Sequence, residues 1–154
     1  MIDFQGKGSL YVAVSGGDAL AAKLQKFGKL AKPILARAMF EEAEEIGNLC
    51  KNKYVPKDTG DLAGSFFREP PVITPYGVRQ VIGFGGAAAK YAWVTHENPR
   101  AGKTGGVSPS GRKYKHWASV GGWKYLERTM NASARHLPRR LGARIMREWQ
   151  GLFF

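Results

Sequence analysis

The sequence predicts an α+β fold, in which a small antiparallel sheet packs on a long N-terminal helix, with a long basic loop and a basic C-terminal helix. Three patterns predict this fold. Apolar residues recur at helical spacing over 29–53, short segments bounded by Pro and Gly alternate over 71–84, and an amphipathic basic stretch follows residue 136. The 154 residues suit one compact domain. We expect a single domain over 1–135, including an N-terminal strand and a mobile loop at 98–120, and a C-terminal extension over 136–154.

The N-terminal part predicts a strand followed by two helices. Residues Ser9–Val14 alternate apolar side chains between two faces, the pattern of a half-buried strand. Asp18 is a suitable N-cap for a short helix that reaches Phe27. A longer helix is expected over Lys29–Lys53, with Pro33 tolerated near its first turn.

The long helix carries two kinds of side chain on different faces. Its apolar stripe consists of Leu35, Met39, Ala43, Ile46 and Cys50. Its acidic cluster consists of Glu41, Glu42, Glu44 and Glu45, most of which point away from the stripe. We interpret the cluster as a solvated face, with an acidic patch for a partner as the alternative.

The middle of the chain predicts a turn and a small sheet. Pro56 stops the helix, and Asp58–Gly60 supply turn chemistry. Strands are expected over Pro71–Thr74 and Val78–Phe84, joined as a hairpin. A further strand is expected over Tyr91–Thr95.

The C-terminal part predicts a basic arm and two helices. The stretch over 98–120 is rich in Gly, Pro and cations, and we interpret it as an arm that becomes ordered on assembly. Helices are expected over Trp123–Arg135 and Arg139–Gln150, with a break at Pro138.

The net charge of +12 is concentrated in the second half of the chain. Residues 1–77 contain ten Lys or Arg and nine Asp or Glu, whereas residues 78–154 contain fourteen and three. Such a half repels copies of itself unless DNA or an acidic partner lies against it, and a merely solvated surface is the third alternative. The predicted partner or DNA interface consists of Arg100, Lys103, Arg112, Lys113, Lys115, Arg139, Arg140, Arg144 and Arg147.

Several classes of function find no support in the sequence. Cys50 is the single cysteine, and we see neither a signal peptide nor an apolar run long enough to span a membrane, so synthesis in a reducing cytoplasm is expected. Gly102-Lys103-Thr104 lacks the earlier glycine of a phosphate loop, because Glu97 stands in its place. His96, His116 and His136 are scattered, and Asp58 and Asp61 suit local capping. We therefore expect no enzyme activity, metal or cofactor.

Three segments, in order, resemble the tail-completion or neck protein family of long-tailed double-stranded-DNA bacteriophages. Val55–Leu62 is similar to the family's proline, Asp-Thr-Gly and Leu segment after a long helix. Tyr91–Glu97 resembles its Tyr-Ala, Val and His-Glu segment, with one residue inserted differently. Gly121–Glu127 is similar to the Gly-rich turn that opens the last helix. The chain after Arg135 lies outside the resemblance.

The resemblance implies a structural virion protein. It implies a ring, with six or twelve copies expected, between the head connector and the tail-terminator or tail-tube proteins, through which DNA passes. The family's motif positions, all with scaffold roles, fall on Pro56, Asp58, Thr59, Gly60, Leu62, Tyr91, His96 and Glu97. It places Thr59 and Gly60 in a turn, and His96 and Glu97 at the end of a strand.

A non-sequence-specific DNA-binding protein is the alternative function. It would use the loop over 98–120 and the C-terminal helix to contact phosphates without reading bases.

Overall fold

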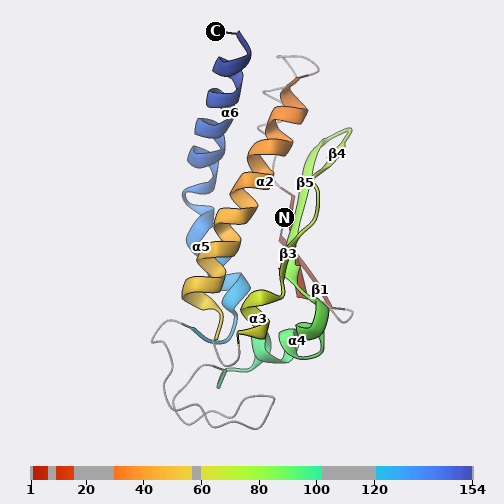
Figure 1. Ribbon diagram of the computed structural model, residues 1–154, viewed down its shortest axis with the longest axis vertical. Coiled ribbons are helices and arrows are strands. Elements are labelled where there is room, and N and C mark those ends of the chain that lie inside the picture. The colour runs from red at the N-terminus through yellow and green to blue at the C-terminus, as the bar shows by residue number, and fades with distance from the viewer. Residues whose placement is uncertain (1, 7–9, 16–29, 57–59, 102–120, 154) are drawn as a thin grey trace.

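The computed structural model describes residues 2–6, 10–15, 30–56, 60–101 and 121–153, and it shows helices packed on one antiparallel sheet (Figure 1). The predicted α+β class is confirmed. The elements in chain order are β1 (Ile2–Gly6), β2 (Leu10–Ser15), α2 (Ala31–Leu49), η2 (Cys50–Tyr54), α3 (Asp61–Gly64), β3 (Phe66–Arg68), β4 (Val72–Thr74), β5 (Gly77–Phe84), η3 (Gly86–Ala88), α4 (Ala89–Glu97), α5 (Tyr125–Ala134) and α6 (Leu137–Phe153).

Strand β5 is the centre of the sheet. The strand order is β1-β2-β5-β3, and β4 also pairs with β5, all antiparallel. The predicted hairpin is confirmed as β4 and β5, and the predicted N-terminal strand is confirmed as β2, apart from Ser9, which lies outside the described residues. The expected helix from Asp18 to Phe27 also lies outside them. Strands β1 and β3 were not predicted.

Helix α2 packs its apolar stripe against β5, as predicted. All five stripe residues are buried. The helix continues without a break into η2, a π-helical turn in which Val55 N donates to Cys50 O at 2.9 Å. Pro33 lies in the first turn, where the missing N–H costs no helical hydrogen bond.

The predicted strand over Tyr91–Thr95 is wrong, because this segment is helix α4. Both edges of β5 are already occupied, by β2 on one side and by β3 and β4 on the other. A following strand would therefore have no place beside β5. The alanines around Lys90 favour helix, and helical spacing buries Ala92, Thr95 and His96.

Two buried clusters divide the core along α2. The first joins α2 to Tyr125 and Leu126 of α5 and to Phe84 of β5. The second joins α2 to Leu141 and Ile145 of α6. Figure 1 shows α6 running beside α2 along most of its length. The predicted break at Pro138 is wrong by two residues, because α6 begins at Leu137 and holds Pro138 in its first turn.

Candidate functional site

The three sequence segments singled out above meet in one place. Gly122 N donates to Tyr54 O at 3.0 Å, and Lys124 N donates to His96 O at 2.6 Å. A Cβ on Gly121 would lie 3.2 Å from Val55 O, so the backbones of these two residues are in contact. Segments that are far apart in the chain thus form a single junction where η2, α4 and the start of α5 come together.

Tyr125 is the centre of this junction. Its hydroxyl donates to Ala92 O at 2.9 Å, and its ring is fully buried. The ring packs edge-on against Phe84, with centroids 5.2 Å apart, and against His96, at 4.9 Å. Burial raises the pKa of the Tyr125 hydroxyl well above its ordinary value. Tyr125 therefore acts as a neutral donor that ties α5 to α4.

A chain of charged groups closes the junction on its outer side. His96 Nδ1 lies 2.8 Å from Glu97 Oε1, and Lys124 Nζ lies 2.8 Å from Glu97 Oε2. Lys124 Nζ also lies 3.4 Å from Glu127. Lys124 adopts a left-handed backbone conformation, with φ of 54°, which costs energy for a residue with a side chain. The ion pairs and the backbone bond to His96 hold it there.

These contacts shift the pKa values of the three groups. Burial lowers the pKa of His96, although the hydrogen bond to Glu97 opposes this effect. Burial also raises the pKa of Glu97, but hydrogen bonds from Lys124 and His96 outweigh it and leave the value lowered. The hydrogen bond to Glu97 raises the pKa of Lys124. At neutral pH the arrangement is a neutral imidazole beside a carboxylate-ammonium pair.

The polar groups of the junction are engaged in packing and ion pairing. The His96 side chain is 1% exposed, and Trp93 stacks beside it with a ring-centroid distance of 6.2 Å. Both oxygens of Glu97 are engaged with Lys124. Within the described ranges, no group of three or more His, Cys, Asp or Glu residues is arranged to hold a metal ion.

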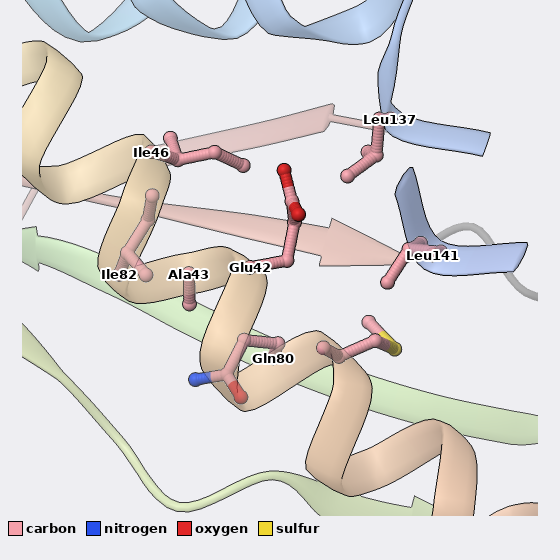
Figure 2. Close-up of a pocket in the computed structure, with 8 residues that line it drawn as sticks. Glu42, Ala43, Ile46, Gln80, Ile82, Leu137 and Leu141 are labelled. Atoms are coloured by element: carbon pink, nitrogen blue, oxygen red, sulfur yellow. The ribbon is translucent and has the colours of Figure 1, made fainter. Parts of the chain in front are cut away.

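A second ionic cluster joins α2 to α6. Glu42 is 1% exposed and accepts from Arg140 Nε at 2.6 Å and from Arg144 Nε at 3.3 Å. Arg144 also pairs with Glu41, at 2.7 Å, and with Glu45. Figure 2 shows the Glu42 side chain pointing from α2 toward Leu137 and Leu141 of α6, beside a cavity of about 30 Å³.

The interpretation of the glutamates as a solvated face is therefore wrong for Glu42. The four glutamates pair with cations of this chain: Glu41, Glu42 and Glu45 with α6, and Glu44 with Arg68 at 3.1 Å. The two helices run antiparallel, and Arg37 near the start of α2 pairs with Glu148 near the end of α6 at 2.7 Å. The acidic cluster thus neutralises part of the basic half within one molecule.

The predicted motif positions that are described lie in the core, in a turn or at the junction. Pro56 and Leu62 are buried, Gly60 turns the chain with φ of 94°, and Tyr91 packs against the first core cluster. His96 and Glu97 lie at the end of a helix, which corrects the expected strand end. Asp58 and Thr59 lie outside the described residues.

The predicted interface positions separate into three groups. Arg100, Arg139 and Arg147 are exposed. Arg140 and Arg144 are engaged by the glutamates of α2. The positions Lys103, Arg112, Lys113 and Lys115 lie outside the described residues, as does the expected arm beyond Ala101.

The sequence analysis missed Glu42 and Lys124 as organising residues. Their partners lie 98 and 27 positions away, so helical spacing carries no signal for either pair. Within the described part of the chain, no helix combines the length and apolarity needed to cross a bilayer. The chain matches no known protein-family model, and no curated protein or solved structure is significantly similar to it.

Proposed function

We propose that this chain is a structural protein of a long-tailed phage, forming the ring at the head-tail junction that joins the connector to the tail tube and lets DNA pass. The proposal starts from the resemblance of three sequence segments. Its main support is that those segments meet at one packed junction, through the close approach of Gly121 to Val55 and Pro56 and the bond from Lys124 to His96. A motif that holds a fold together is expected to show such convergence.

Exposed apolar side chains further support a role in an assembly. Val72 and Ile73 of β4 are 55% and 48% exposed, and Tyr76 in the adjacent turn is 81% exposed. Neighbouring apolar residues left in water at a hairpin tip are typical of protein contact sites. A ring offers a second copy or a neck neighbour to cover them.

The test is the copy number of this chain in purified virions, measured by quantitative mass spectrometry against the major tail protein. We expect six or twelve copies, together with density for the chain at the neck in reconstructions. Free protein should be largely monomeric by light scattering, because its cationic surface repels other copies. Absence of the chain from mature particles would contradict the virion role.

Non-sequence-specific DNA binding is the second candidate function. It is favoured by exposed cations such as Arg100, Arg139 and Arg147, which have no acidic partner within 4.0 Å in the described ranges. Deletion of residues 98–120 separates the two functions. Loss of DNA binding with intact virion assembly would favour this candidate, whereas failed assembly would favour the ring role.

A further inference from the structure

The cations of the described chain fall into two populations. One population is matched by glutamates and consists of Arg37, Arg68, Lys124, Arg140 and Arg144. Around η2, at the end of α2 that adjoins the junction, three cations have no acidic partner within 4.0 Å among the described residues: Lys51, Lys53 and Arg128, as is also true of Arg139 and Arg147 on α6. The acidic residue next to Arg128 in sequence, Glu127, already pairs with Lys124.

Two of these cations lie beside the ring of Tyr54. Lys53 Nζ lies 5.8 Å from the centroid of the Tyr54 ring, and Arg128 Cζ lies 5.3 Å from the same point. Both distances are within the range at which an aromatic face attracts a cation. Lys51, which also belongs to η2, has its Nζ 5.0 Å from the ring centroid of Phe66 in β3. The side chains are therefore positioned by the fold.

The backbone beneath this surface is fixed as well. Tyr54 O accepts from Gly122 N at 3.0 Å, and a Cβ on Gly122 would lie 3.7 Å from Arg128 Nη1. The π-helical turn that carries Tyr54 is a rare local structure that occurs frequently at functional sites. Lys53 and Arg128 are exposed, so a ligand can reach both.

The positive charges of Lys53 and Arg128 lie close enough together to favour the binding of an anion. The two distances to the Tyr54 ring place Lys53 and Arg128 no more than about 11 Å apart, a length over which duplex DNA carries about six negative charges. The Debye length at physiological salt is about 8 Å, which is comparable to this upper limit. An anionic polymer such as DNA can neutralise both charges at once, and its condensed counterions are released as they are replaced.

We propose that Lys51, Lys53 and Arg128, arranged around Tyr54, form the surface that contacts the phosphate backbone of duplex DNA. The proposal rests on the part of the proposed function that brings DNA past this chain. It moves the contact from α6, where Glu42 already engages Arg140 and Arg144, to the end of α2. Lys53 and Arg128 are exposed and Lys51 is half-buried, and we expect them to contact phosphates, which carry no sequence information.

The test compares two variants of the full chain with equal net charge. Lys53→Gln combined with Arg128→Gln removes the proposed contacts, and Arg139→Gln combined with Arg147→Gln removes two exposed cations of α6. Binding to a fluorescent 20-base-pair duplex is measured by anisotropy over a salt series. Loss of two phosphate contacts should reduce the slope of log K against log salt by about 1.8, and the α6 variant should change it by less than about 0.5.

Each outcome decides the question. Equal slopes for the two variants, or no binding by the wild type at low salt, would overturn the proposal. Displacement of DNA by poly-glutamate at equal charge concentration with higher affinity would assign the surface to an acidic protein and also overturn it. Lys51→Gln alone, with an expected slope change of about 0.9, provides a second reading if the double variant unfolds. Virion copy number is measured separately, so failure of the ring role is distinguishable from failure of this surface.

Discussion

Substitution of Glu42 by Gln tests whether the buried carboxylate fixes α6 on α2. Glu42 Oε1 lies 2.6 Å from Arg140 Nε and 2.5 Å from Arg140 Nη2, and Oε2 lies 3.3 Å from Arg144 Nε. Gln keeps the shape but removes the charge. Its oxygen can accept from Arg140, and its amide then faces Arg144 donor to donor.

The expected loss of stability depends on how deeply the Glu42 ion pairs are buried. Breaking a fully buried ion pair costs about 3–5 kcal/mol. Here the Arg140 side chain is 35% exposed, and Arg144 retains Glu41 and Glu45. We therefore expect a loss of about 2 kcal/mol, which for a chain of this size lowers the melting temperature by about 4–8 °C.

The assay is urea unfolding followed by circular dichroism, with thermal melts in parallel. Glu45→Gln is the matched control, because it makes the same chemical change on the same helix at a side chain that is 56% exposed. It should cost less than about 1 kcal/mol. Equal effects of Glu42→Gln and Glu45→Gln would refute the reasoning, because burial would then make no difference.

Three further predictions concern the junction and the core. Burial lowers the pKa of His96 below 6.5, so protonation of His96 favours the unfolded chain. The free energy of unfolding should therefore hold its full value above pH 6.5 and decline as the pH falls below it. In urea titrations, His96→Gln should remove that decline, whereas the control His136→Gln should leave it. Gly122→Ala should destabilise the fold by about 2 kcal/mol, because φ at this position is 152° and the added Cβ would lie 2.9 Å from the backbone oxygen of Ala101. Gly142→Ala is the control: its Cβ would meet open space, so thermal melts should show a neutral or stabilising effect. Burial raises the pKa of the Cys50 thiol to about 12, so it should resist a thiol reagent at about pH 8 until urea is added; rapid labelling of the folded protein would contradict this.

Local patterns predicted most of the elements and few of their contacts. The stripe on α2 and the hairpin of β4 and β5 follow from residue spacing, which depends only on helix and strand geometry. Helix α4 was missed because a short apolar run has no decisive period. A strand at this position would need a free edge of β5, and whether an edge is free depends on how the whole sheet is paired.

The candidate site was predicted only in part for a related reason. His96 and Glu97 were identified from the sequence, but their partner Lys124 is recruited by a turn that places it in a left-handed conformation. The acidic cluster of α2 was identified as a group. Its burial depends on α6 lying against it, which no property of the α2 segment by itself indicates.

The separation between Glu42 and its arginine partners also has a consequence during translation. Arg140 and Arg144 follow Glu42 by 98 and 102 residues. At about 5–20 residues per second, the ribosome delivers the arginines roughly 5–20 s after the glutamate. During that interval α2 of the nascent chain exposes its acidic side chains and the apolar surface against which α6 later packs. Release of the chain before Arg140 is added would leave this apolar surface of α2 accessible to chaperones and proteases.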